Sequence, residues 1–353
     1  MNALAPADLG YFMPAEWHRH EATWLAWPKD PITWPDRVPQ VESIFAQMIA
    51  LLSVHERVEL LVDDALTEAK VLERVKRLSA NLSNVRFHHI PTVDSWIRDY
   101  GPNFLLRRQA GATDLAFNHW LFNAWGGKYE ELKKDADIPS KIAPLLGVPR
   151  FLPGIVLEGG SIDVNGAGTC LTTEQCLLNP NRNPGLSKGE IEGFLKKHLG
   201  VSQVIWLGQG IAGDDTDGHI DDIARFVAAD TIVCSAEEDP ADENYHLLED
   251  NVRRLGKARD AGGNALNIIR LPMPGMVAGT EGRLPASYAN FYIANGLVLA
   301  PVFGHPKDRR ALQILENLFP DRRVVGINCE SLVWGLGAIH CVTQQQPARG
   351  LTA

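Results

Sequence analysis

Short apolar runs alternate along the chain with longer segments in which apolar residues recur at helical spacing. The short runs are typical of β-strands, and the longer segments are typical of amphipathic helices. The expected strands are 22–27, 58–62, 85–90, 204–207, 232–234, 267–271, 288–293, 297–302 and 323–328. The expected helices are 38–53, 64–79, 187–199, 242–261 and 307–318.

This alternation of strands and helices indicates the α/β class. No Ser/Gly/Pro-rich linker or run of charge divides the chain, so we expect one domain over residues 1–353. The pattern alone leaves a barrel, a doubly wound sheet and a propeller open, because no convincing residue-level repeat is visible.

Composition narrows the function classes. The 353 residues are 45% hydrophobic and 22% charged, as in an ordinary soluble protein. A net charge of −9 without any Lys/Arg block argues against nucleic-acid binding. No apolar run is long enough to span a membrane, and no signal peptide is visible. Five cysteines without a C-x-x-C pair read as reduced thiols, so we expect a cytoplasmic protein.

One of these cysteines, Cys341, follows Gly335-Leu336-Gly337-Ala338-Ile339-His340, and we expect it in a short apolar strand. A thiolate is among the few side chains that attack carbon directly. A buried cysteine that acts as a small hydrophobe is the alternative.

Two further segments combine charge with aromatic residues or glycine. Residues 96–102 place Arg98 and Asp99 between aromatic residues at an expected strand end, either as a functional acid or as a structural pair. Residues 156–160 end an apolar run with Glu158, and two glycines follow. Glycines keep bulk away from whatever the acid faces, although a turn would also explain them.

Residues 214–226 are rich in acids and contain His219. If a strand begins at His219, then His219 and Asp221 share one face, and His219 is a candidate general acid/base. A metal site or a solvated loop are the alternatives. Residues 118–129 hold Trp120 and Trp125 beside two glycines. These tryptophans suit the wall of a site for a cationic ligand, or the core.

A thiol, a histidine and several carboxylates together suit a guanidinium substrate. A guanidinium group is planar and permanently charged, and it matches carboxylates through paired hydrogen bonds. A soft thiolate can attack its carbon, and one histidine can protonate the departing ammonia and then activate water.

These segments carry a resemblance to a known family. The resemblance rests on residues 96–102, 123–127, 157–163, 217–221, 287–296 and 339–347. Together they resemble the agmatine deiminases, which belong to the guanidino-group-modifying superfamily in its branch with the bacterial peptidyl-arginine deiminases. The resemblance implies a five-bladed α/β propeller (pentein) of ββαβ-type units around a central active site.

The resemblance also implies roles for individual residues. Cys341 matches the nucleophile and His219 the general acid/base, while Asp99, Asp221 and Glu158 match the acids that hold the substrate. The implied substrate-binding residues are Trp96, Trp125, Gly159 and Asn290. No metal or organic cofactor is implied.

The implied ligand is a small cationic guanidine. The implied reaction converts agmatine and water to N-carbamoylputrescine and ammonia, a step of putrescine and polyamine biosynthesis. The family also leads us to expect a homodimer or a higher homo-oligomer.

Two departures from the family pattern concern the substrate. The family usually has Gly-Gly-Gly-Asn where this chain has Gly335-Leu336-Gly337-Ala338, and Asn where it has Asp222. Arginine, peptidyl-arginine or another guanidine is therefore the alternative substrate. On the expected strand Arg225 shares the face of His219 and Asp221, where it would meet a substrate carboxylate or, as we favour, pair with a structural acid.

Three other functions remain open at this point. His18 and His20, added to the histidine and acids above, would supply enough ligands for a metal-dependent hydrolase. An amidinotransferase would use the same thiol chemistry but pass the amidino group to an amine. A non-catalytic propeller would bind partners and would have no use for the nucleophile.

Overall fold

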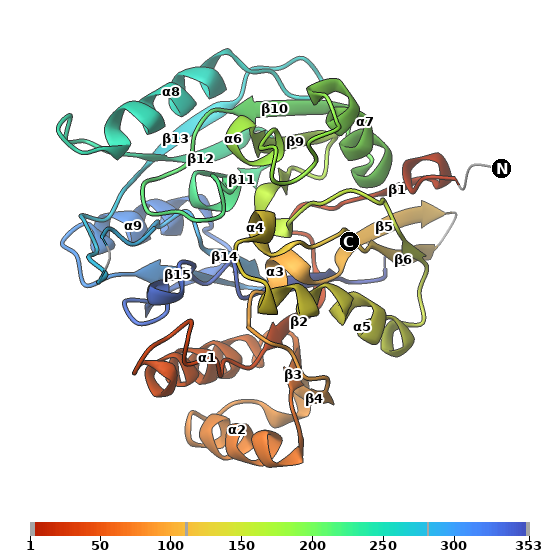
Figure 1. Ribbon diagram of the computed structural model, residues 1–353, viewed down its shortest axis with the longest axis vertical. Helices are drawn as coiled ribbons and strands as arrows, with labels where there is room; N and C mark the ends of the chain where they lie inside the picture. Colours follow the sequence, from red (N-terminus) through yellow and green to blue (C-terminus); the bar gives the residue numbers. More distant parts are fainter. Residues whose placement is uncertain (1–3, 110–111, 281, 351–353) are drawn as a thin grey trace.

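The computed structural model describes residues 4–109, 112–280 and 282–350. The described strands form five separate sheets, and the longer helices pack on their outer sides (Figure 1). This arrangement confirms the expected α/β class. Among the described residues, no helix combines the length and the hydropathy that crossing a bilayer requires.

Each sheet contains the same unit, an antiparallel strand pair followed by a helical crossover to a parallel strand. In the third sheet β8 (Asp163–Val164) pairs antiparallel with β9 (Thr169–Thr173), and β10 (Gln203–Leu207) pairs parallel with β9. The connection between β9 and β10 contains α6 (Glu174–Leu177) and α7 (Lys188–Leu199). A parallel pair needs such a crossover, because a tight hairpin can join only antiparallel strands.

Two more sheets repeat this order closely. The fourth sheet consists of β11 (Ala224–Ala228), β12 (Thr231–Ala236), α8 (Asn244–Lys257) and β13 (Asn267–Pro272). The fifth consists of β14 (Tyr292–Ala294), β15 (Leu297–Val302), α9 (Asp308–Leu318) and β16 (Arg323–Asn328).

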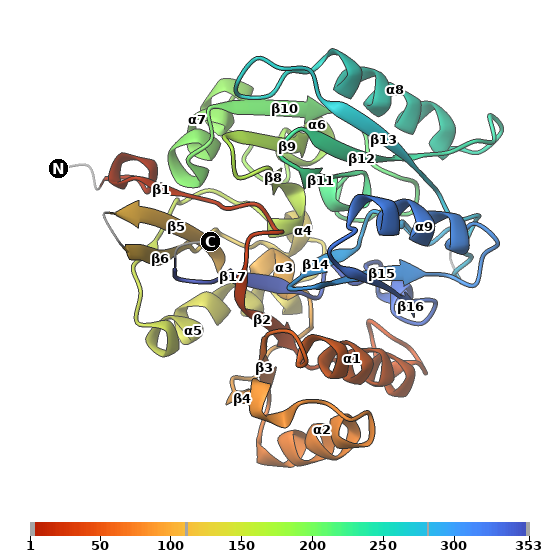
Figure 2. The same ribbon diagram turned by 180° about the vertical axis from the view of Figure 1, so that it is seen from behind.

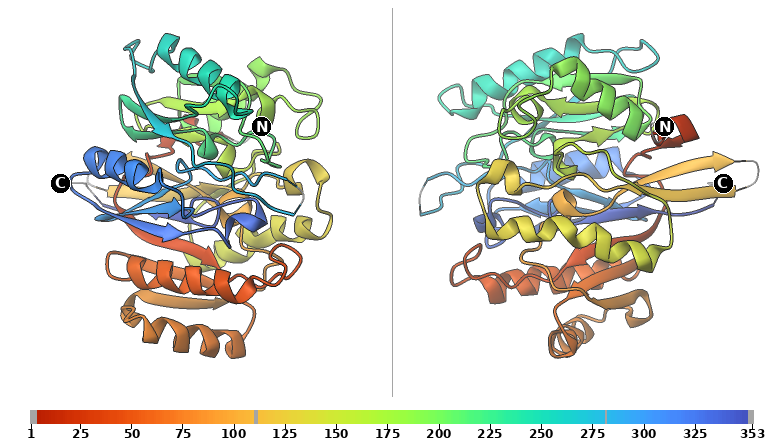
Figure 3. Two further views of the ribbon diagram at one scale, coloured as in Figure 1. Left: turned by 90° about the vertical axis from the view of Figure 1, so that its left-hand side faces the viewer. Right: turned by 45° about the vertical axis from the view of Figure 1, so that its right-hand side comes forward.

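The other two sheets carry an extra strand. The second sheet has the order β1 (Tyr11–Phe12), β5 (Asn103–Gln109), β6 (Ala112–Asn118) and β7 (Arg150–Phe151), with α5 (Ile138–Leu146) before β7. The first sheet has the order β17 (Gln344–Pro347), β2 (His20–Ala26), β3 (Arg57–Val62) and β4 (Val85–His89). Its crossover helices are α1 (Val38–Leu52) and α2 (Ala65–Arg77), which lie at the opposite end of the molecule from α8 (Figure 3).

The first unit is completed by the two distant ends of the described chain. β17 pairs antiparallel with β2, so that Gln344 lies opposite Trp24 (Figure 2). Five ββαβ units, closed in this way, are the number that the expected five-bladed propeller requires.

Short helices and turns connect the strands and supply most of the site. These are η1 (Ala7–Leu9), η2 (Leu82–Asn84), α3 (Ile97–Tyr100), α4 (Ala124–Gly127), η3 (Glu131–Asp137), η4 (Gly159–Ser161), η5 (Ile220–Asp222) and η6 (Val333–Gly335). α3 and α4 lie in the middle of the molecule, between the sheets (Figure 1).

Candidate active site

Every unit places a candidate site residue just before the first strand of its antiparallel pair, and of the candidates only Trp125, on α4 after β6, lies elsewhere. Asp99 on α3 precedes β5, and Glu158 precedes η4 and β8. His219 and Asp221 precede β11, Asn290 precedes β14, and Cys341 precedes β17. The repeat that the sequence hides is therefore one of position rather than residue type.

His219 lies between two carboxyl groups. Its Nδ1 atom is 3.8 Å from Oδ1 of Asp99, and its Nε2 atom is 3.9 Å from Oε2 of Glu158. Neither ring nitrogen has a hydrogen-bond partner among the described residues, although the side chain is buried. Burial lowers the pKa of His219 to about 3, so the ring is neutral before a ligand binds.

Asp99 and Glu158 are fixed by different donors. Trp125 Nε1 and the Gly160 amide each donate to Asp99 at 2.9 Å, and Arg182 Nε donates to Glu158 Oε1 at 2.6 Å. Burial raises the pKa of Asp99 far above its usual range, and the charges of Asp221 and Glu158 raise it further. Burial also raises the pKa of Glu158, and Arg182 offsets only part of that rise.

Asp221 is held by His340, the residue directly before the cysteine. His340 Nδ1 lies 2.6 Å from Asp221 Oδ2, and His340 Nε2 lies 2.8 Å from Glu16 Oε2. Burial favours the neutral form of Asp221, but the hydrogen bond and charge of His340 outweigh it and lower the pKa of Asp221. Asp221 therefore stays ionised, and its Oδ1 atom has no partner among the described residues.

The Cys341 thiol sits against Asp221 and an amide donor. Its Sγ atom is 3.8 Å from Asp221 Oδ2, and Asn290 Nδ2 donates to Sγ at 3.1 Å. Burial raises the pKa of Cys341 well above its usual value, and the charges of Asp221, Asp222 and Asp99 add to the rise. A cation bound here would oppose the effect of these negative charges on the pKa and would favour the thiolate.

Gly160 makes room for whatever these groups bind. A Cβ atom on Gly160 would lie 2.6 Å from His219 Nδ1, 2.8 Å from Asp99 Oδ1 and 3.0 Å from Asp221 Oδ2. A Cβ atom on Gly159 would instead lie 2.1 Å from the carbonyl oxygen of Arg98. Gly160 is thus the glycine that faces the acids, whereas Gly159, the one expected to bind substrate, packs against backbone.

Asp99 and Cys341 are among the residues that line a cavity of about 400 Å³. Trp96 and Trp125 are among its walls, and Leu336 lines it as well. Leu336 has a left-handed backbone with φ of 68°, a conformation that glycine adopts far more easily. The lining of the cavity therefore combines apolar and aromatic side chains with several carboxyl groups.

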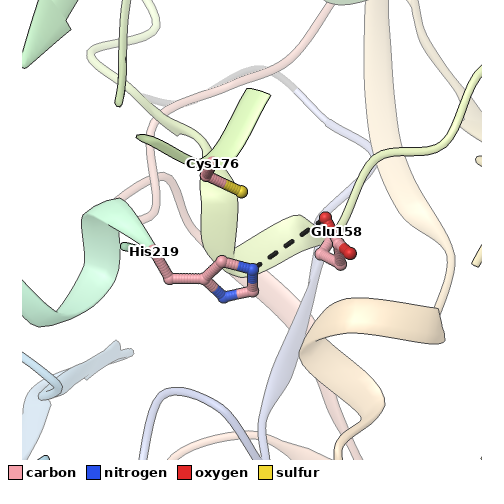
Figure 4. Close-up of side chains that lie close together, drawn as sticks. All are labelled: Glu158, Cys176 and His219. Atoms are coloured by element: carbon pink, nitrogen blue, oxygen red, sulfur yellow. Dashed lines mark ion pairs between the residues drawn. The ribbon is translucent and has the colours of Figure 1, made fainter. Parts of the chain in front are cut away.

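The described residues contain two groups of side chains close enough to share a metal ion. One consists of Glu158, Cys176 and His219 (Figure 4), and the other of Asp221, Asp222 and Cys341. His18 and His20 belong to neither group. Instead His18 Nδ1 lies 3.0 Å from the Arg19 carbonyl oxygen, and His20 pairs with Glu56. The H-x-H pair thus does not join His219 in a metal-binding group.

A profile of the Porphyromonas-type peptidyl-arginine deiminases matches residues 12–347. Agmatine deiminase of Medicago truncatula is 39% identical, over 97% of this chain and 98% of its own. The solved structure of Enterococcus faecalis agmatine deiminase, described as catalysing its reaction, superposes with a TM-score of 0.89 at 33% identity, covering 98% of each chain.

A further solved structure is a cysteine-to-serine variant of C. jejuni agmatine deiminase with substrate bound. It has a TM-score of 0.84 at 30% identity and covers 97% of each chain. The chain belongs to the Porphyromonas-type peptidyl-arginine deiminase family.

In this member of the Porphyromonas-type peptidyl-arginine deiminase family, three local predictions from the sequence are wrong. No strand begins at His219, because the residues after it form η5 and β11 starts at Ala224. The cysteine lies in a turn before β17, which is a polar strand. Asp99 lies in a short helix rather than at a strand end.

Arg225 therefore does not share a strand face with His219. It is buried, lies 2.8 Å from Glu16 Oε2, pairs with Asp163 and donates to the Phe291 carbonyl oxygen at 2.8 Å. The structural pairing that we favoured is confirmed.

Two residues that fix the acids of the candidate site in this family member were not predicted: Arg182 and His340. His340 directly precedes Cys341, yet adjacency in sequence does not show that its ring reaches Asp221. Arg182 lies in the polar stretch Asn179-Pro180-Asn181-Arg182, which the alternation of strands and helices passes over. The glycine pair after Glu158 is part of the prediction from the sequence, but only the structure shows that Gly160 is the glycine that faces the acids.

Proposed function

We propose that the protein hydrolyses agmatine to N-carbamoylputrescine and ammonia through a covalent intermediate on Cys341. The family membership supports the reaction class. The relatives named above are agmatine deiminases, which supports the substrate.

The charges of the residues that line the cavity support agmatine as the substrate. The described lining residues include Asp30, Glu130, Glu131 and Asp215, and no lysine, arginine or histidine is among them. Agmatine has a second cation at its far end, which these acids suit. Arginine has a carboxylate there, and Arg225 is already engaged with Asp163 and Glu16. The cavity therefore favours agmatine over arginine.

Binding the guanidinium group would use the unpartnered acid and imidazole atoms. Asp99, Glu158 and Asp221 surround His219 and can accept the guanidinium N–H groups, with Gly160 leaving space between them. A planar cation in this low-dielectric setting is held by several charge-assisted hydrogen bonds. Trp96 and Trp125 would cover the apolar stem of the substrate.

The first half-reaction forms the covalent intermediate. With the cation bound, the Cys341 thiol gives its proton to neutral His219, and the thiolate attacks the guanidinium carbon. His219 then protonates one nitrogen, which leaves as ammonia when its C–N bond breaks. A positively charged thiouronium group remains on the sulfur.

The second half-reaction releases the product. His219, neutral again, takes a proton from water while the water oxygen bonds to the same carbon. The C–S bond breaks, the sulfur recovers a proton from the new hydroxyl group, and the ureido product forms. His219 finally releases its proton to solvent.

The five units would act as one catalytic domain, because each supplies a residue to the same site. The described cysteines are free thiols, which suits a reducing compartment such as the cytoplasm.

A substrate panel tests the proposal. Purified enzyme is given agmatine, arginine, an arginyl peptide and a simple guanidine, and both ammonia and ureido product are measured without any amine acceptor. We expect agmatine to have the highest kcat/KM and to release one ammonia per ureido product. Faster turnover of arginine would contradict the substrate, and ammonia release that requires an acceptor would indicate an amidinotransferase.

A further inference from the structure

Cys176 on α6 has a position that the proposed reaction does not use. Its sulfur points toward His219 and Glu158 from the side of α6 (Figure 4). One ligand atom from each of Glu158, Cys176 and His219 lies within 4.8 Å of the other two, and all three side chains are buried. A thiol is only a weak hydrogen-bond acceptor for a guanidinium group, so substrate binding does not explain the position of this sulfur.

We propose that Glu158, Cys176 and His219 form a binding site for a soft divalent cation such as Zn²⁺, and that the bound ion excludes the guanidine substrate. A carboxylate oxygen, an imidazole nitrogen and a thiolate sulfur are the ligand types that Zn²⁺ prefers. Three protein ligands leave a fourth position for water, as in an open site.

The unpartnered atoms support this assignment. Glu158 Oε2 and His219 Nε2 are buried and have no hydrogen-bond partner among the described residues, while Arg182 occupies the other oxygen of Glu158. These two atoms are 3.9 Å apart. Ligands bound tetrahedrally at about 2.1 Å from one ion are separated by about 3.4 Å, so only a small movement is needed.

The surrounding charges favour a cation. Asp99 and Asp221 lie near Nδ1 of His219, whereas the Arg182 guanidinium, which contacts Glu158, is already paired with Glu158 and Asp217. Burial raises the pKa of Cys176, and Glu158 adds to this. As the metal–sulfur bond forms, the Cys176 proton is released to solvent, because coordination favours the thiolate.

The ion and the substrate would compete for the same atoms. The metal takes Glu158 Oε2 and an unprotonated nitrogen of His219, which the proposed deiminase reaction needs for binding and proton transfer. This competition rests on the proposed function, but metal binding itself does not.

Binding is tested with Co²⁺ as a spectroscopic probe in the Cys341→Ala protein, which lacks the other candidate thiolate ligand. We expect a thiolate-to-Co²⁺ charge-transfer band in this variant, because Cys176 is intact. The band should disappear when Cys176→Ser is added and remain when Cys234→Ser, at another buried cysteine, is added instead. A Cys341→Ala protein without the band, or a band that survives Cys176→Ser, overturns the proposal. If the protein with both Cys341→Ala and Cys176→Ser does not fold, the presence or absence of the band in the Cys341→Ala protein still tests the proposal.

Competition is tested by Zn²⁺ inhibition of agmatine turnover, with Mg²⁺ as a hard cation that should have little effect. We expect added agmatine to relieve the inhibition. The Cys176→Ser enzyme should keep its metal-free turnover and require on the order of tenfold more Zn²⁺ for inhibition. Equal sensitivity of both enzymes would overturn the proposal and place the ion at Asp221, Asp222 and Cys341. If the enzyme does not turn over agmatine at all, the proposed function fails while the Co²⁺ result still decides the metal site.

Discussion

At the scale of single residues, burial keeps both the proposed nucleophile and the proposed general acid/base neutral when no cation is bound. Burial holds His219 deprotonated and Cys341 protonated. His340 meanwhile keeps Asp221 ionised. A neutral thiol is a weak nucleophile. Binding of the guanidinium cation would therefore promote formation of the thiolate that attacks it. A small electrophile without a positive charge would encounter a neutral, unreactive thiol.

Gly160 offers a direct test of how closely these groups are fitted. In the Gly160→Ala variant the new methyl group would lie less than 3 Å from His219 and Asp99, so both must move. We expect kcat/KM for agmatine to fall roughly a hundredfold, since displacement of catalytic groups by about 1 Å has effects of this size. Steady-state kinetics with the purified variant measures it.

Gly193 provides the matched control. A Cβ atom there meets nothing within 4 Å, so Gly193→Ala should leave kcat/KM unchanged. Wild-type activity in Gly160→Ala would show that the acids and His219 do not surround the substrate as proposed.

At the scale of secondary structure, the sequence predicts the outer elements well and the inner ones poorly. The strand 323–328 and the helices near 38–53 and 307–318 agree with β16, α1 and α9 to within a residue or so. The two helices each bury one face, so their periodicity is clear. The polar turns that hold His219 and Cys341 have no periodicity, because their side chains face one another instead of the apolar core.

The strand β17 shows how an inner element supports the site. Arg98 Nη1 donates to Gln345 Oε1 at 2.7 Å, and Trp24 Nε1 donates to Gln346 Oε1 at 2.9 Å. Both glutamines are buried. Arg98 also donates its backbone amide to the Cys341 carbonyl oxygen at 3.2 Å, so this arginine links β17 to the turn that holds Cys341.

We expect Gln345→Leu to destabilise the protein by about 1–3 kcal/mol or more, because it leaves part of a buried charge without its acceptor. Gln346→Leu is the matched control, since it removes the same acceptor group from a neutral indole and should cost less. Urea unfolding of both variants measures the difference. An equal or smaller loss in Gln345→Leu would contradict the importance that we give to Arg98.

At the scale of the whole molecule, five similar units enclose a centre crowded with acids. Each unit contributes mainly through the residues before its first strand, which is why no single stretch of sequence contains the candidate site. The resemblance of several motifs to a known family predicted this architecture, whereas the alternation of strands and helices could not distinguish it from a wound sheet or a barrel.

Buried carboxyl groups make the free energy of unfolding depend on pH, and Asp94 provides one such contribution. Burial raises the pKa of Asp94 to about 7, against roughly 4 in an unfolded chain. The folded protein therefore binds more protons in this interval, and the contribution of Asp94 to stability decreases as pH rises through it.

Asp94→Asn removes this titration. We expect the free energy of unfolding of the wild type, minus that of the variant, to fall by a few kcal/mol between about pH 4 and pH 7. Urea unfolding of both proteins across this range measures it. A difference that stays constant, or that rises with pH, would contradict a buried carboxyl group with a raised pKa.

The pairing of β17 with β2 has a consequence for the order in which the enzyme is made. Synthesis delivers Asp99, Glu158 and His219 long before Cys341, and the strand that anchors the cysteine must find a partner made near the start. A growing chain, or one cut short before residue 341, would contain Asp99, Glu158 and His219 but would lack the proposed nucleophile. The enzyme would therefore become active only after translation has reached β17 and this strand has paired with β2.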